Sequence, residues 1–276
     1  MNTRDLSRGL AIPDVQAYPD QRNLAIQRVG VRGLRYPLRW RAQGGVQETV
    51  MQASLDVALP AEQKGTHMSR FIALLQALGQ DQALDLQGML RLHHNMLQRL
   101  QANEGQIEFE FPLFLSKKAP VSGVESLLDY QIALKSYGAL HQTRCEISVT
   151  APVTSLCPCS KEVSAYGAHN QRSHLQLQAR LDLGKLGDFS VEALIAIAES
   201  QASSEVYGLL KRVDEKHVTE RAYDNPKFVE DLVRDVAAAM KASQERAGII
   251  AFCVGAENFE SIHNHSAWAQ LQSPHW

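Results

Sequence analysis

The residues best suited to chemistry lie in one polar stretch, residues 154–174, with the sequence TSLCPCSKEVSAYGAHNQRSH. It holds Cys157 and Cys159 on either side of a proline, with His169 a short way further along. Thiolates bind soft or borderline metals, and imidazole suits zinc, iron and manganese. A catalytic metal usually has three protein ligands and keeps one position open for water. The stretch therefore favours a catalytic metal site, completed by a carboxylate from elsewhere in the chain.

Three other interpretations of this stretch stay open on the residues alone. A structural metal site usually has four ligands and C-x-x-C spacing, which the stretch lacks. Cys157 could instead be a nucleophile that a histidine activates as a base. Both cysteines could also be small packing residues with no chemical role.

Apolar and polar residues alternate on both sides of the polar stretch, at 145–151 and at 175–181. Such alternation is typical of half-buried strands. The sequence therefore predicts a polar loop carried between two strands, a place where proteins often put binding and catalytic residues.

The same reasoning along the rest of the chain predicts two halves with the same order of elements. In the first half we expect strands and helices at 27–40 (strand), 46–59 (strand), 67–78 (helix), 84–100 (helix), 107–115 (strand) and 127–140 (strand). In the second half, after the two strands beside the loop, we expect a helix at 191–200, a helix capped by Asn225 with Pro226 at its first position, and strands at 249–254 and 259–265.

This order, ββααββ repeated twice, predicts an α+β fold with weak internal repetition. We expect a mobile N-terminal arm over residues 1–22, a first unit over 23–141 and a second unit over 142–276, which carries the Cys-Pro-Cys loop. The two units are expected to form one integrated catalytic domain.

Composition excludes several classes of function. The chain has 276 residues, 45% of them hydrophobic, and a net charge of −2, so it offers no broad basic surface for nucleic acid or an anionic membrane. The N-terminus lacks the apolar core of a signal peptide, and no run is long enough to span a membrane. The four cysteines do not form a disulfide pattern. We therefore expect a cytoplasmic protein that binds neither nucleic acid nor membrane.

Four longer stretches carry a resemblance to a known family. SLCPCSKEVSAYGAHNQRS (155–173) resembles the active-site signature of the type IB GTP cyclohydrolases. The same family order continues in KGTHMSRF (64–71), SSEVYGLLKRVDEKHVTERAYDNPKFVEDLVRD (203–235) and ENFESIHNH (257–265). A match in several long parts is far more specific than a single short motif.

The resemblance implies the tunnelling fold, in which antiparallel sheets carry helices on one face and subunits close their sheets into a barrel. It also implies a homotetramer with active sites where subunits meet. The implied reaction converts GTP and water to 7,8-dihydroneopterin triphosphate and formate, the first step of tetrahydrofolate biosynthesis.

The resemblance further implies one divalent metal per active site, which would turn water into a nucleophile at neutral pH. Its ligands would be Cys157, His169 and Glu205, with Cys157 also counted among the catalytic residues. One thiolate, one imidazole and one carboxylate are compatible with zinc, manganese or iron.

Substrate recognition is expected from a glutamate and several cations. Glu220 matches the family glutamate that accepts hydrogen bonds from the guanine N1–H and exocyclic amine. The triphosphate would contact basic residues, some of them at the start of a helix, where anions are favoured: Lys64, His67, Arg70, Lys161 and Arg172.

Proton transfer is expected from the segment near the C-terminus. His263 and His265 lie two residues apart in a predicted strand and would share a face, with Glu260 on the other face. A pair of histidines suits proton transfer to the opening ring and to the departing formate. We therefore predict that all three side chains are catalytic.

Two rival functions remain on the sequence. The nitrile reductase of queuosine synthesis shares the fold and uses a cysteine nucleophile with NADPH, but its E-S/L-K-S/A motif is not visible. The segment YQIALKSY contains LKS without the preceding glutamate. The other rival is a non-catalytic scaffold that binds metal or pterin. Formate release from GTP would separate the cyclohydrolase from both.

Overall fold

The computed structural model describes residues 14–81, 83–186 and 189–276. Its strands are β1 (Ile26–Ala42), β2 (Gly45–Leu59), β3 (Glu104–Lys118), β4 (Glu125–Ala139), β5 (Arg144–Leu156), β6 (Asn170–Leu181), β7 (Ser204–Glu205), β8 (Ile249–Asn258) and β9 (Ala267–Gln272). Its helices are η1 (Val15–Ala17), α1 (Met68–Asp81), α2 (Leu86–Leu100), α3 (Pro158–Val163), α4 (Val191–Gln201), α5 (Arg212–Asp224) and α6 (Val229–Ser243).

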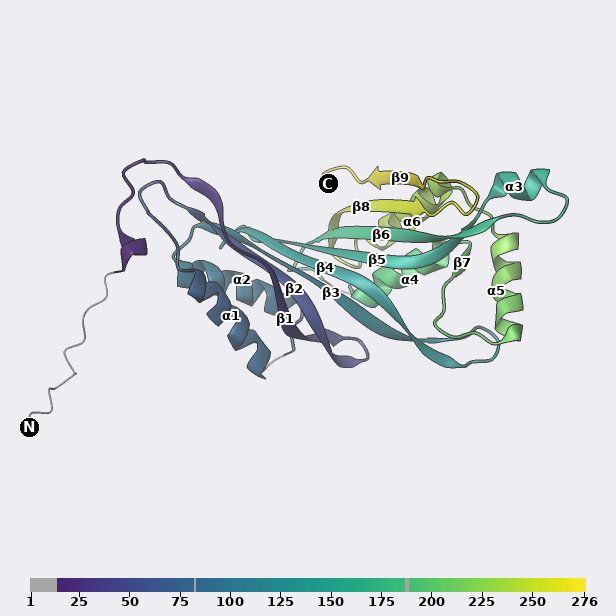
Figure 1. Cartoon of the computed structure of the whole chain (residues 1–276), viewed down its shortest axis with the longest axis horizontal. Coiled ribbons are helices and arrows are strands. Elements are labelled where there is room, and N and C mark those ends of the chain that lie inside the picture. The colour runs from purple at the N-terminus through teal and green to yellow at the C-terminus, as the bar shows by residue number, and fades with distance from the viewer. Residues whose placement is uncertain (1–13, 82, 187–188) are drawn as a thin grey trace, which may run out of the picture.

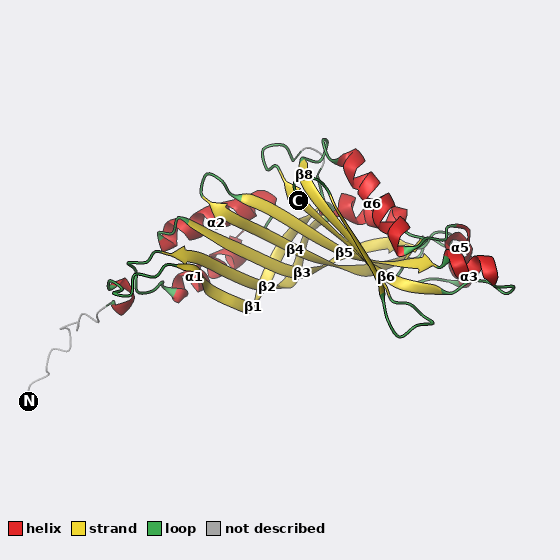
Figure 2. Ribbon diagram, turned by 90° about the horizontal axis from the view of Figure 1, so that it is seen from above, coloured by secondary structure: helices red, strands yellow, loops and turns green. Residues whose placement is uncertain are grey.

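The strands within the described residues form one antiparallel sheet in the order β1-β2-β3-β4-β5-β6-β8-β9, with the short β7 paired to β5. Helices α1 and α2 pack on the first strands, and α4 and α6 pack on the last ones. The sheet is long and strongly twisted, and Figures 1 and 2 show α1 and α2 at one end and α3 and α5 at the other. The predicted α+β architecture is confirmed.

Strand β3 shows why the sequence forms this sheet. Ile107, Phe109 and Phe111 are buried under the helices, whereas Glu108 and Glu110 between them face the opposite side. Alternate residues of a strand point to opposite faces, so a period of two gives one apolar and one polar face. The apolar faces of neighbouring strands and the inner faces of the helices share a single core.

The two halves of the chain join in the middle of the sheet. Strand β4 pairs with β5, with Leu134 opposite Ile147, and the unit boundary predicted after residue 141 falls in the turn between them. The predicted arm lies partly outside the described residues, which begin at 14. Within the described part, Pro19 forms a bridge with Gln63, so this segment lies against the chain just before α1.

Two predictions about the second half are wrong. Asn225 does not begin a helix, because its backbone N–H bonds to carbonyls of α5 and its side chain donates to the Ala202 carbonyl at 2.8 Å. Helix α6 begins later, at Val229. Residues 259–265 do not form a strand: from 261 onwards they are exposed turn and bend, so their alternation has no buried face to hold it.

Helix α5 was missed because its sequence carries no apolar stripe; Asp214 and Ala222 are its buried residues. Instead, the Asp214 carboxylate accepts hydrogen bonds from Val121 N at 2.9 Å, Ser122 N at 2.8 Å and Ser122 Oγ at 2.6 Å. Burial raises the pKa of Asp214, but these hydrogen bonds bring the pKa below its usual range. The ionised side chain thereby fastens the β3–β4 turn to the start of α5.

Candidate functional site

Cys157 and His169 stand at the two ends of the polar loop. Their strands β5 and β6 pair as far as Leu156 opposite Asn170, and the Cys157 N–H then donates to the His169 carbonyl at 3.1 Å. Cys157 also caps α3, with its Sγ accepting from Ser160 N at 3.5 Å. The strand pairing therefore holds the thiol-bearing and imidazole-bearing residues side by side, as the sequence predicts.

His169 lies in a small polar cluster that also contains two residues from the β8–β9 connection, Glu260 and Ser261. Its Nδ1 is 2.8 Å from Gln171 Oε1 and 3.9 Å from Glu260 Oε2. The Gln171 amide nitrogen is 3.5 Å from Glu260 Oε1, and Ser261 Oγ is 3.4 Å from Nδ1. Of the three residues predicted to transfer protons, Glu260 is therefore the one that lies beside His169.

Glu205 lies in an ion network next to this cluster. It pairs with Val153 of β5, and its two carboxylate oxygens contact Lys117 Nζ at 2.8 Å and Arg221 Nη1 at 3.5 Å. Lys117 also binds the Glu199 carboxylate at 2.7 Å. Burial raises the pKa of Glu205, but its contacts with Lys117, Arg221 and Tyr207 together more than offset this, so the pKa lies below its ordinary value. Glu205 is therefore ionised and held by two cations.

A cavity of about 320 Å³ is lined both by Glu205 of the network and by Gln171 of the histidine cluster. Gln171, Arg172 and Glu205 line it together with Thr154, Asn170, Val206, Tyr207, Leu210 and Val218. Burial raises the pKa of Tyr207 to about 12, so this lining hydroxyl stays protonated at neutral pH. The structure thus brings predicted residues from two distant stretches of sequence to one cavity.

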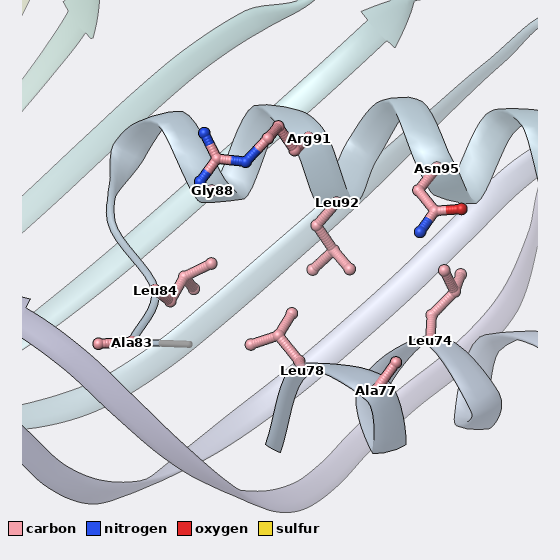
Figure 3. A pocket seen from close by; sticks show the side chains of 9 residues that line it. All are labelled: Leu74, Ala77, Leu78, Ala83, Leu84, Gly88, Arg91, Leu92 and Asn95. Carbon is pink, nitrogen blue, oxygen red and sulfur yellow. The ribbon is translucent and has the colours of Figure 1, made fainter. Parts of the chain in front are cut away.

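Figure 3 shows a second cavity, of about 260 Å³, between α1 and α2. The labelled side chains that line it are mostly leucines and alanines, with Arg91 and Asn95 at one side. Because none of the predicted site residues lines this cavity, the cavity beside Glu205 is the candidate site.

His263 and His265 lie together although they are not in a strand. Their rings stack with centroids 5.0 Å apart and planes at 14°, on an exposed bend. The two histidines therefore lie together as predicted, but an exposed bend brings them together and not the alternation of a strand.

Glu220 lies on α5. It is exposed and binds Lys216 one turn earlier, with Lys216 Nζ 2.9 Å from its carboxylate. Lys161 of α3 lies over the Tyr223 ring at 4.2 Å and donates to the Tyr223 carbonyl. Glu220 and Lys161 are thus on adjoining helices at the end of the sheet that carries the cysteine loop (Figure 1).

The basic residues of the segment 64–71 lie at the opposite end of the molecule from Cys157 (Figures 1 and 2). Lys64 Nζ is 5.8 Å from the centre of the Tyr18 ring, and His67 Nε2 is 3.3 Å from Asp14 Oδ2. Arg70 donates to the Arg99 carbonyl at 3.0 Å. Within one chain, the structure does not bring these three residues to the candidate site.

A catalytic metal ion usually takes three protein ligands. Throughout residues 14–81, 83–186 and 189–276, no three His, Cys, Asp or Glu side chains gather closely enough to hold one. The donor types nevertheless suit zinc, iron or manganese, because the backbones of Cys157 and His169 are hydrogen-bonded to each other and the Glu260 carboxylate lies 3.9 Å from His169 Nδ1. Glu205 would have to leave or share its two cations to become the third ligand.

The sequence analysis missed four residues of this region: Lys117, Tyr130, Gln171 and Glu199. A signal existed for two of them. Lys117 falls on the alternate positions of β3 that face the core. Tyr130 lies on the buried face of β4, where its hydroxyl donates to Glu199 at 2.6 Å. A lysine at a core-facing strand position requires a buried carboxylate partner. The identity of that partner follows only from the folded chain.

Comparison with known proteins identifies the family. The family model described as type I GTP cyclohydrolase FolE2 matches residues 12–269. GTP cyclohydrolase FolE2 of Janthinobacterium sp. (strain Marseille) is 57% identical over 278 residues, which covers 99% of this chain and 98% of that protein. GTP cyclohydrolase FolE2 2 of Cupriavidus metallidurans is 54% identical over 269 residues, 97% of each chain.

Solved structures support the fold. Urate oxidase from Bacillus subtilis 168 superposes with a TM-score of 0.51 at 8% identity, over 90% of this chain and 98% of that one. Uricase from Arthrobacter globiformis gives a TM-score of 0.50 at 8% identity, over 89% and 92%. At this identity the likeness concerns architecture alone, and the predicted tunnelling fold is confirmed. The family model matches residues 12–269, and two family members are 54% and 57% identical along nearly the whole chain. The chain therefore belongs to the type I GTP cyclohydrolase FolE2 family.

Proposed function

We propose that this chain hydrolyses GTP to 7,8-dihydroneopterin triphosphate and formate and so begins tetrahydrofolate biosynthesis. The observation that carries the proposal is the family match over residues 12–269. The neighbouring Cys157 and His169, with the Glu260 carboxylate beside His169, supply the donor types that this chemistry needs. Nothing in the comparisons favours the nitrile reductase or the non-catalytic scaffold.

We place a divalent metal, zinc, manganese or iron, on Cys157, His169 and Glu205. When bound, it would lower the pKa of a water molecule and so supply the nucleophile for C8 of guanine. Because Glu205 forms ion pairs with Lys117 and Arg221, its carboxylate would have to break or lengthen one of them in order to bind the metal. Supporting this, Glu205 lines the same cavity as Gln171, which contacts His169.

The remaining steps fall to side chains of the protein. Glu220 accepts hydrogen bonds from the guanine N1–H and amine and so orients the base. Glu260 and the stacked pair of His263 and His265 hold and move the protons of ring opening, because they lie on the connection that reaches His169. Arg172, which lines the cavity, and Lys161 on α3 bind part of the triphosphate.

The enzyme is proposed to act as a homotetramer with sites shared between subunits. The basic segment 64–71 lies at the far end of its own chain, so a neighbouring subunit must bring it to the cysteine loop. Strands β1 and β9 are the outer strands of the described sheet, and Trp268 of β9 is 64% exposed. Unpaired outer strands are ready to pair with another chain.

Complementation between two inactive variants is the expected result of a shared site. One variant carries Cys157→Ala, and the other carries Lys64→Ala with Arg70→Ala. In a symmetric oligomer assembled at random from equal amounts of the two variants, about a quarter of the sites should combine an intact cysteine loop from one subunit with an intact basic segment from its neighbour. Co-expression should therefore restore about a quarter of the wild-type activity. Sedimentation velocity should show a tetramer. A fully active monomer, or tetramers without any recovery of activity, would contradict the proposal.

The function itself is tested by incubating metal-reconstituted protein with GTP and measuring formate together with pterin fluorescence after oxidation. Formate release in proportion to pterin supports the cyclohydrolase. Consumption of NADPH with a deazapurine nitrile, without formate from GTP, would instead identify a nitrile reductase.

A cytoplasmic location is part of the same proposal. The four cysteines are free thiols, which fits a reducing compartment. No helix in the described part of the chain is both long and apolar enough to cross a membrane.

A further inference from the structure

The side chain of Gln171 lies buried between two residues of the candidate site. It is 6% exposed and sits on the inward face of β6, opposite Ser155 of β5. Its carbonyl oxygen is 2.8 Å from His169 Nδ1, and its amide nitrogen is 3.5 Å from Glu260 Oε1. A buried amide in a strand must satisfy both of its ends, and here the two ends contact the two groups that the proposed chemistry uses.

The direction of these hydrogen bonds follows from what each group can donate. The Gln171 amide nitrogen donates to Glu260 Oε1, so the end of Gln171 that faces Glu260 is the NH₂ group. The carbonyl therefore faces His169, and Nδ1 must carry the proton in order to donate to it. In a neutral imidazole the other nitrogen, Nε2, then has the free lone pair.

We propose that Gln171 is a positioning residue that fixes His169 as the Nδ1–H tautomer and leaves Nε2 free to bind the metal. The inference deepens the proposed function and rests on it. Metal-binding histidines usually donate their second ring N–H to a fixed acceptor, and removal of that acceptor typically weakens metal affinity 10- to 100-fold. Gln171 supplies this acceptor from β6, two residues further along the chain.

The two contacts also explain why residue 171 carries an amide and not a carboxylate. A glutamate there would still accept from Nδ1–H, but it would place a second negative charge next to Glu260. The amide instead satisfies both neighbours without added charge. This difference provides a conservative variant that separates the two contacts.

The test measures the affinity of the metal-free full-length protein for Zn²⁺, by competition with a chromophoric chelator, in four forms. Gln171→Leu keeps the size of the side chain but removes the acceptor, so its Zn²⁺ dissociation constant should rise 10- to 100-fold. Gln171→Glu keeps the acceptor, so its Zn²⁺ affinity should stay close to that of the wild type and escape the 10- to 100-fold loss expected for Gln171→Leu. Gln176→Leu changes an exposed residue of the same strand and should match the wild type.

Each outcome bears on the inference. Wild-type affinity in Gln171→Leu would overturn it. Equal weakening in Gln171→Glu and Gln171→Leu would also overturn it, because the acceptor would then not be the feature that matters. Formate release from GTP by the wild type is measured in parallel. If the wild type binds Zn²⁺ but forms no formate, the proposed function fails while the affinity series still decides the role of Gln171.

Discussion

Cys157→Ala is expected to release no measurable formate from GTP and to bind metal weakly. The thiolate is the softest of the three proposed ligands, and alanine leaves no donor in its place. The variant should fold, because Cys157 is only partly buried and lies at the end of β5, outside the strand alternation that fills the core. Metal analysis and a formate assay on the purified protein measure both effects.

Two further variants make this result specific. Cys157→Ser keeps the cap of α3, since serine is a favoured N-cap residue, but its hydroxyl remains protonated near neutral pH and is a poor ligand. It should therefore lose metal and activity while keeping the helix. Cys159→Ala changes an exposed residue of the same short helix and should keep metal and at least part of the activity. Full metal content and turnover in Cys157→Ala, with both lost in Cys159→Ala, would assign the role to the other cysteine.

Glu220→Gln is expected to lower kcat/KM for GTP at least tenfold while metal content stays normal. Glutamine keeps the shape but replaces one acceptor with a donor, which faces the donors of the guanine edge. A lost hydrogen bond to a charged group costs about 1.5–3 kcal/mol. Folding should change little, because the recorded partner of Glu220 is Lys216, and an exposed pair of this spacing contributes only about 0.3–0.5 kcal/mol.

The control for this variant lies on the same helix. Glu215 is also exposed on α5, and Glu215→Gln removes one negative charge without touching the proposed guanine site. It should show wild-type kinetics. Steady-state assays on both variants decide the role, since unchanged kcat/KM in Glu220→Gln would remove Glu220 from substrate binding.

Strand alternation predicted most of the sheet. The strands of the first half, the two strands beside the loop and helix α2 lie within a few residues of their expected positions. Most of them bury a periodic apolar face, and β1 does so only towards its end, at Leu38 and Trp40. Helix α5 could not be found this way, since Asp214 holds it through hydrogen bonds to a distant turn. The segment 259–265 was predicted as a strand because its sequence alternates, but from residue 261 onwards it forms an exposed turn and bend.

The candidate site was predictable only where it is local in sequence. Cys157 and His169 meet because their strands pair directly, and the sequence carries both strands plainly. The contacts of Glu205 with Lys117 and Arg221 depend on segments that approach one another only after folding. The predicted ligand roles, the metal and the tetramer remain predictions that the experiments above address.

The order of the strands also sets the order in which the site can assemble. Strands β3 to β6 follow one another as hairpins, so this segment closes short loops, whereas β8 reaches β6 only after the chain between Leu181 and Ile249 has been ordered. Longer closures cost more chain entropy and slow the formation of the contact. We therefore expect the β5–β6 hairpin with Cys157, His169 and Gln171 to form before Glu260 arrives with β8. Pulse-labelled hydrogen exchange during refolding should protect the β5 amides before those of β8, and simultaneous protection would show that the two ends of the site fold as one unit.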